Sequence, residues 1–110
     1  MLTTVLVSFG IPSDKTTEEV IEKFRGGAHK WREREGLIRK YYLVSPDGRG
    51  IVGVYHWRSR EDAEAVFETG FREGIEKGYG SLPEITYYDT PIVVDNELGR
   101  VQFDGAAAPA

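Results

Sequence analysis

Aromatic side chains are the residues of this chain best suited to form a binding site. Such residues most often pack in a core or an interface. Rings around a cavity, however, with tyrosine hydroxyls as the few polar groups, would suit a flat aromatic or quinone-like ligand. The sequence therefore predicts an aromatic pocket, and its candidate lining comes from Trp31, Tyr41, Tyr42, Tyr55, Trp57, Phe67, Phe71, Tyr87 and Tyr88.

The segment 51–58 indicates which rings could share that pocket. Alternation along a strand places Gly53, Tyr55 and Trp57 on one face and His56 on the other. If the first face looks toward the helices, the two rings border a cavity and Gly53 leaves space at its floor. His56 would then face a partner subunit.

The candidate site residues follow from this arrangement. Trp31 and Phe67 would form the far wall, and one tyrosine would donate a proton. Arg39 or Lys40 could point into the same space and pair with an anion, although a solvated strand end is the commoner arrangement for such residues. We expect catalytic roles for Trp57, Tyr55 and Tyr42 and substrate-binding roles for Trp31, Phe67, Gly53 and His56.

Several other kinds of site find no support in the residue inventory. The only histidines, His29 and His56, lack the spacing of metal ligands, and the chain has no cysteine. No G-x-S-x-G, G-x-G-x-x-G or P-loop motif is present. The sequence therefore predicts neither a metal site nor a bound cofactor.

Composition and charge limit the classes of partner and the compartment that we expect for this protein. The 110 residues carry a net charge of −4 without a block of consecutive basic residues, which argues against nucleic acid. No stretch approaches the roughly 18 apolar residues of a membrane span, and the first ten residues lack a basic n-region. The absence of cysteine fits a reducing cytoplasm, where we expect the protein.

The first half of the chain has the pattern of a strand, a helix and a hairpin. Residues 2–9 alternate as a strand, and Thr16 with Glu19 forms a capping box for a helix through about Arg34. Two strands, 37–45 and 51–58, flank a Pro-Asp-Gly turn. A slip of one residue in this hairpin would exchange Tyr41 for Tyr42 beside Trp57.

The second half completes the pattern with a helical segment and a strand. Ser59 and Asp62 provide a helix cap, and apolar residues then recur every four positions. Gly70 and two further glycines make this helix a poor, broken one. Residues 84–94 have the pattern of a fourth strand with a kink at Pro91, and the terminal GAAAPA indicates a loose tail.

This order of elements predicts an α+β, ferredoxin-like β-α-β-β-α-β fold with an antiparallel sheet and both helices on one face. We expect a single ferredoxin-like domain over residues 1–98 and a C-terminal extension over 99–110. Two helices cover only one face of the sheet. Because the strands carry apolar or aromatic residues on both faces, the uncovered face needs a partner. We therefore expect a homodimer that packs through this face of the sheet, a dimeric α/β barrel.

Residues 36–67, GLIRKYYLVSPDGRGIVGVYHWRSREDAEAVF, carry a resemblance to a known family. The Gly53-Val54-Tyr55 run, Trp57 followed by Arg58-Ser59, and a helix with Ala63 and Phe67 resemble the small mono-oxygenases of the dimeric α/β-barrel superfamily, of the antibiotic-biosynthesis-monooxygenase type. The final stretch, residues 93–98, is similar as well. The resemblance covers most of residues 2–98.

The resemblance implies a homodimer that uses O₂ without metal or flavin, with an electron-rich phenolic or anthrone-like substrate as the reductant. It also implies that Trp57 lines the pocket. The quinone-forming members have an asparagine where this chain has Gly53. Residues that the haem-degrading relatives need, an Asn on the first strand and a His on the second helical segment, are absent, so haem degradation is not expected.

Three functions are compatible with this sequence. The first is a cofactor-independent monooxygenase acting on a small aromatic or polyphenolic substrate. The second is a non-catalytic small-molecule-binding or stress-response protein whose pocket is only core. The third is an isomerase on the same fold, in which His56 or Asp89 moves a proton.

Overall fold

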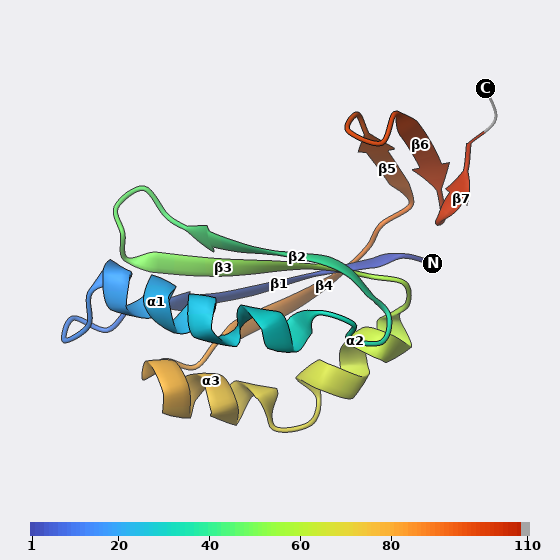
Figure 1. Cartoon of the computed structure of the whole chain (residues 1–110). Coiled ribbons are helices and arrows are strands. Elements are labelled where there is room, and N and C mark those ends of the chain that lie inside the picture. Colours follow the sequence, from blue (N-terminus) through green and yellow to red (C-terminus); the bar gives the residue numbers. More distant parts are fainter. Residues whose placement is uncertain (109–110) are drawn as a thin grey trace.

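The computed structural model describes residues 1–108, which form a main sheet, the helices that cover one of its faces, and a small C-terminal sheet (Figure 1). The elements are β1 Thr3–Gly10, α1 Thr17–Gly27, the 3-10 helix η1 Ala28–Trp31, β2 Leu37–Val44, β3 Gly50–Trp57, α2 Arg60–Phe67, α3 Phe71–Tyr79, β4 Glu84–Asp89, β5 Ile92–Asp95, β6 Arg100–Phe103 and β7 Ala106–Ala107.

The main sheet has the antiparallel order β2-β3-β1-β4, and all helices lie on one of its faces (Figure 1). This is the ferredoxin-like arrangement expected from the sequence, and the prediction is confirmed. Val5 and Val7 of β1 point to the helices and are buried in the main core, because alternate residues of a strand share a face.

The first helix begins where predicted and ends earlier. Thr16 caps α1 by accepting a hydrogen bond from the amide of Glu19 at 3.2 Å. The expected extension through Arg34 is wrong, because α1 ends at Gly27 and continues only as the short η1. Two consecutive glycines give the helix little stability at that point.

The hairpin has the predicted turn, with Gly48 at φ 74°. Its register places Tyr42 opposite Gly53 and Lys40 opposite Tyr55. Residues directly opposite each other share a face of the sheet, so Tyr42, rather than Tyr41, lies on the helix side. A register shift between Leu37 and Arg39, at the end of the hairpin away from the turn, then brings Leu37 opposite Trp57.

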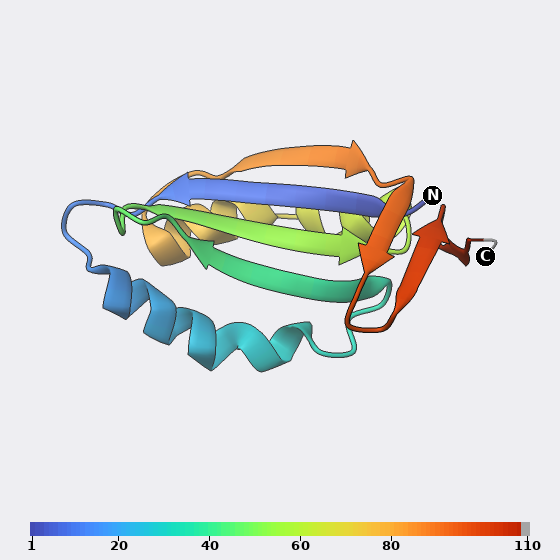
Figure 2. The same ribbon diagram turned by 90° about the horizontal axis from the view of Figure 1, so that it is seen from above.

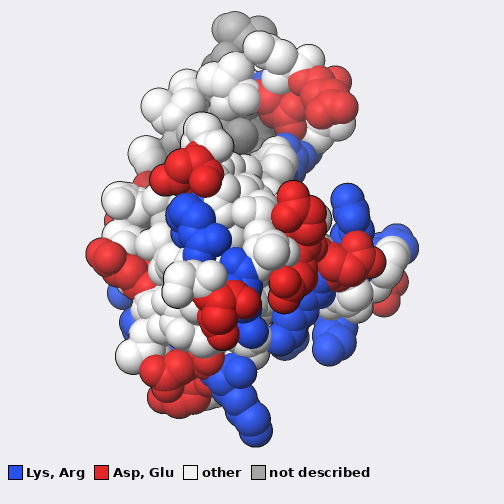
Figure 3. Space-filling view, turned by 90° about the vertical axis from the view of Figure 1, so that its left-hand side faces the viewer, with Lys and Arg blue, Asp and Glu red and all other residues white. Residues whose placement is uncertain are grey.

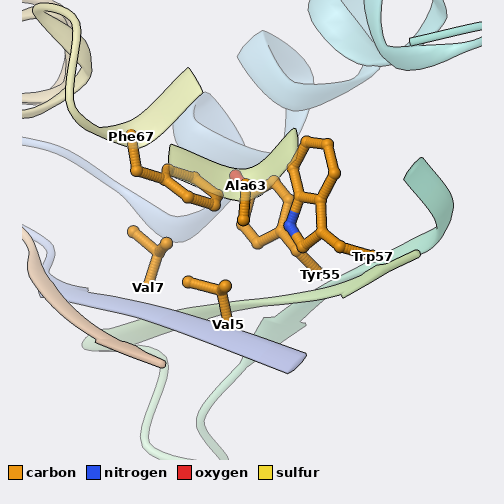
Figure 4. Packing of buried hydrophobic residues seen from close by; sticks show 6 residues of the cluster. All are labelled: Val5, Val7, Tyr55, Trp57, Ala63 and Phe67. Carbon is orange, nitrogen blue, oxygen red and sulfur yellow. The ribbon is translucent and has the colours of Figure 1, made fainter. Parts of the chain in front are cut away.

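The second helical segment is broken, as expected, and the break lies at Gly70, the first of its three glycines. Ser59 caps α2 through the amide of Asp62 at 3.1 Å, and Gly70, at φ 80°, separates α2 from α3. The main core lies where α2 meets β1 and β3, and Figure 4 shows six of its members: Val5, Val7, Tyr55, Trp57, Ala63 and Phe67.

The C-terminal region differs most from the prediction. A continuous strand over 84–94 is wrong, because β4 ends at Asp89 and β5, after Pro91, belongs to a second sheet of order β5-β6-β7. Proline lacks the amide that a sheet ladder needs. The predicted loose tail from Gly105 carries β7, and its last two residues, 109 and 110, lie outside the described part.

The small sheet also affects the expected division of the chain. A boundary at residue 98 falls in the turn between β5 and β6, which pair with each other. The small sheet lies beyond one end of the main sheet (Figure 2), on the side opposite the helices (Figure 1). Asp95 reaches Arg39 of β2 at 3.6 Å and thereby connects the two sheets.

Candidate functional site

A cavity of about 190 Å³ lies between the main sheet and the helices. The sheet forms its floor, α1 with η1 forms one wall, and α3 forms the other. Its lining is mostly aromatic and aliphatic, with three lysines, and consists of Val7, Phe9, Lys23, Phe24, Gly27, Lys30, Trp31, Lys40, Tyr42, Ile51, Gly53, Tyr55, Phe71, Ile75 and Tyr79. Seven of these 15 lining residues are aromatic.

Lys40 is the most unusual residue of this lining. Its Nζ lies 4.0 Å from the ring centroids of both Trp31 and Tyr42, and 4.6 Å from that of Tyr55. Within residues 1–108 no carboxylate lies within ion-pair distance of it. Burial in this aromatic cage lowers the pKa of Lys40 to about 7. Near neutral pH the amine is therefore partly unprotonated and can accept a proton.

Three tyrosines surround the same space. Burial, together with the neighbouring Tyr42 and Tyr79 hydroxyls, raises the pKa of Tyr55 far above its usual range. Burial also raises the pKa of Tyr42 and of Tyr79. All three stay protonated near neutral pH and can donate hydrogen bonds to a ligand.

The floor at Gly53 is occupied in a way that the sequence did not indicate. A Cβ at Gly53 would lie 2.8 Å from Cε1 of Tyr55, because the Tyr55 ring lies across the glycine. We expected Gly53 to leave open floor space. The space instead holds the Tyr55 ring, so that the missing side chain positions a wall of the cavity.

Trp57 and Phe67 lie beside the cavity rather than in its lining. Trp57 is fully buried, and its ring meets that of Phe67 edge to face at 5.8 Å (Figure 4). Tyr55 stands between this pair and the cavity, with its ring centroid 4.9 Å from Phe67. The implied pocket-lining role of Trp57 is not what this geometry favours, since the side chain is part of the core.

His56 and Asp89 are remote from the cavity. The side chain of His56 lies on the outer face of the sheet, opposite Thr4 and Arg39 in the register. Asp89 is exposed at the end of β4. Neither residue lines the cavity, so that neither is placed to move a proton of a ligand bound there.

Of the expected site residues, the structure therefore brings together Trp31, Tyr42, Gly53 and Tyr55. Phe71, one of the aromatic candidates, lines the cavity as well, whereas the sequence pattern gave Lys40 little weight and did not point to Phe24 and Tyr79. A signal for Lys40 was available, because the strand alternation that places Tyr42 inward also places Lys40 inward. The hairpin register determines whether Tyr42 or Tyr41 faces inward, and the turn residues alone do not fix that register.

Within residues 1–108, no group of three or more His, Cys, Asp or Glu side chains could hold a metal ion. None of the helices in that range is long and apolar enough to cross a bilayer.

No family model and no curated protein sequence matches the chain. Solved structures do. A monooxygenase from ActVA-Orf6 of Streptomyces coelicolor, in complex with nanaomycin D, gives a TM-score of 0.64 at 22% identity, over 84% of this chain and 89% of that one. SnoaB, a cofactor-independent oxygenase from Streptomyces nogalater, gives 0.62 at 17% identity, over 81% and 92%.

A third structure, Rv0793 from Mycobacterium tuberculosis, gives a TM-score of 0.63 at 16% identity over 82% of this chain and 95% of that one. At sequence identities this low, the structural similarity establishes the fold and nothing further. The chain therefore has the fold of the antibiotic-biosynthesis-monooxygenase-like proteins, as the resemblance of residues 36–67 implied.

Proposed function

We propose that this protein, which shares the fold of antibiotic-biosynthesis-monooxygenase-like proteins, is a cofactor-independent monooxygenase for a small phenolic substrate. The observation that carries the proposal is Lys40, a lysine enclosed by three aromatic rings at the cavity and without a carboxylate partner within residues 1–108. The fold shared with two proteins described as a monooxygenase and a cofactor-independent oxygenase supports it.

The chemistry begins with a proton transfer. The neutral amine of Lys40 accepts the phenolic proton, and the resulting ammonium stabilises the phenolate in a cavity of low polarity. The phenolate is electron-rich and transfers one electron to O₂. The aryloxyl radical and superoxide then combine at the para carbon, which forms a C–O bond and gives a hydroperoxide after protonation.

Collapse of the hydroperoxide completes the reaction. The para C–H proton leaves, the O–O bond breaks and water is released, so that a phenol and O₂ yield a para-quinone and water. The substrate supplies all four electrons. The protonated hydroxyls of Tyr42 and Tyr55 line the cavity and are suited to donate protons or hydrogen bonds to the reduced oxygen.

The size of the cavity limits the substrate. Its volume of about 190 Å³ is below the roughly 300–1,000 Å³ typical of drug-sized ligands. We therefore infer a substrate of one or two fused rings. The rings of Trp31 and Tyr55 meet edge to face at 5.3 Å and form a corner of the cavity, against which a flat ring would pack.

The proposal includes a homodimer through the outer face of the main sheet. Leu6, Val54 and Tyr41 form one row across three strands of that face, and Val52 and Leu43 lie in the next row. Tyr41 and Leu43 are about half exposed, at 51% and 45%. A second copy packed on this face would cover these side chains.

The experiment that tests this function combines binding and turnover in one sample. Metal-free protein is titrated with one-ring and two-ring phenols under ¹⁸O₂, while Trp fluorescence and dissolved oxygen are followed. The proposal expects quenching with uptake of one O₂ per quinone, and one labelled oxygen in the quinone. Quenching without oxygen uptake would instead identify a small-molecule-binding protein or an isomerase.

A further inference from the structure

The charged residues that line the cavity are all positive. Three of its lining residues are lysines and none is an aspartate or glutamate, although the whole chain has 18 acidic against 14 basic residues. Over the end of the molecule seen in Figure 3, Lys and Arg side chains are interspersed with Asp and Glu. The positive lining is therefore a property of the cavity rather than of the surface in general.

The three lysines differ in the interactions that their ammonium groups make within the protein. Lys23 donates a hydrogen bond to the carbonyl oxygen of Gly78 and lies 4.7 Å from the ring centroid of Tyr79, so that it joins α1 to α3. Lys40 sits in the aromatic cage. Lys30 is exposed at the mouth, and within residues 1–108 it has no ion pair or side-chain hydrogen bond.

A neutral phenol would use only one of these charges. Lys40 can exchange a proton with the hydroxyl group, as proposed above, but Lys30 would remain without a partner of opposite sign. A second negative group on the ligand would meet Lys30 at the mouth, where the field of the three lysines adds. Lys30 directly precedes Trp31 in η1, and the ring of Trp31 contacts Lys40 on the floor, so that the wall residue at the mouth adjoins the ring beside the reacting amine.

We propose that the natural ligand is an aromatic acid, a hydroxylated ring that also carries a permanently negative group such as a carboxylate, with that group held at Lys30. This inference rests on the proposed function, because it names the substrate class of the same cavity. Lys30 is thereby a specificity-determining residue, and Lys40 remains available to the hydroxyl group.

The test compares two ligands that differ in one charge. Calorimetric titration without oxygen measures the affinities of 5-hydroxy-2-naphthoate and of its neutral methyl ester for the parent, for Lys30→Gln and for Lys77→Gln. Lys77 is an exposed lysine of α3 outside the lining and serves as the matched control. We expect the acid to bind about tenfold more tightly than the ester to the parent.

The variants separate the outcomes. Lys30→Gln is expected to remove most of the preference for the acid and leave ester binding unchanged, whereas Lys77→Gln keeps the preference. Equal affinities for acid and ester, an equal effect of the two variants, or no binding of either ligand would overturn the inference. If the acid is not preferred but the parent protein consumes oxygen with the ester, this inference fails and the oxygenase proposal survives. If the acid is preferred but no oxygen is consumed, the inference about the ligand holds and the oxygenase proposal fails.

Discussion

The ammonium nitrogen of Lys40 lies 4.6 Å from the ring centroid of Tyr55, directly across the β2–β3 register. Tyr55 fixes the shape of the cavity by lying across Gly53, and Lys40 supplies the nitrogen that we propose as its base. Because burial opposes the charged form of an amine, this arrangement also has a measurable effect on stability.

Lys40→Met is expected to stabilise the folded protein, and more so at low pH. The pKa of Lys40 is about 7 in the folded protein and 10.5 as a free side chain, so the unfolded chain binds the extra proton between these values. The penalty of the parent therefore grows as the pH falls from 10.5 and is complete below 7. The variant should gain about 2.7 kcal/mol more at pH 6 than at pH 9, measured by urea unfolding.

A gain that is the same at both pH values would mean that Lys40 titrates normally in the folded protein. Lys77→Met is the control for this comparison. Lys77 is exposed, and its replacement should leave the pH dependence of unfolding unchanged.

The two tryptophans are expected to separate stability from binding. Trp57 is fully buried, and Trp57→Ala should cost about 3–5 kcal/mol of unfolding free energy; Trp57→Phe is the milder variant and should fold with parental ligand affinity. Trp31→Ala should weaken aromatic ligands about tenfold at a smaller cost in stability. Thermal unfolding and fluorescence titration measure the two effects. Lost binding in a folded Trp57→Phe protein would instead assign Trp57 to the site.

Gly53→Ala is expected to distort the cavity. The new Cβ would lie 2.8 Å from the Tyr55 ring, so the ring must move, at a cost of about 1–3 kcal/mol and with weaker ligand binding. Gly74→Ala is the matched control, because nothing lies within 4 Å of its Cβ position on α3, and alanine should there stabilise the helix by about 0.5–1 kcal/mol. Unchanged affinity in Gly53→Ala would show that the Tyr55 position does not shape the site.

A charge on the outer face of the sheet is expected to dissociate the proposed dimer. Val54 lies in the central apolar row of that face, so Val54→Lys would bring two like charges together in a water-poor interface. Sedimentation velocity should show a dimer for the parent and for Glu73→Lys, an exposed position on α3, and a monomer for Val54→Lys. A parent that sediments as a monomer would contradict the assigned interface.

The fold was largely predictable because its signals are local. The Thr16 and Ser59 caps, the turn at Gly48 and the break at Gly70 each depend on a few neighbouring residues, and each appears where the sequence placed it. The second sheet was missed. Its short strands pair only with one another, and a four-residue strand after a proline carries too little alternation to be separated from β4.

The site was predictable only in part because it depends on packing between distant elements. Strand alternation put Tyr55 and Trp57 on one face and left the choice between Tyr41 and Tyr42 to the hairpin register, and it could not tell that Tyr55 would shield Trp57 from the cavity. That relation depends on Gly53, whose missing side chain admits the ring, and on Phe67 behind it. The aromatic cage of Lys40 likewise depends on a distant element, because the ring centroid of Trp31 in η1 lies 4.0 Å from Lys40 Nζ. The sequence pattern of β2 alone does not show this contact.

The pH dependence of oxygen uptake by the parent and by Lys40→Met tests the central claim most directly. With a two-ring phenol as substrate, the account predicts that kcat/KM of the parent rises with pH through an apparent pKa near 7, the value of the Lys40 amine. Lys40→Met should lose at least about a hundredfold in rate and lose this limb of the profile, while Lys77→Met retains both. Parental oxygen uptake by a folded Lys40→Met protein, with an unchanged pH profile, would contradict the account.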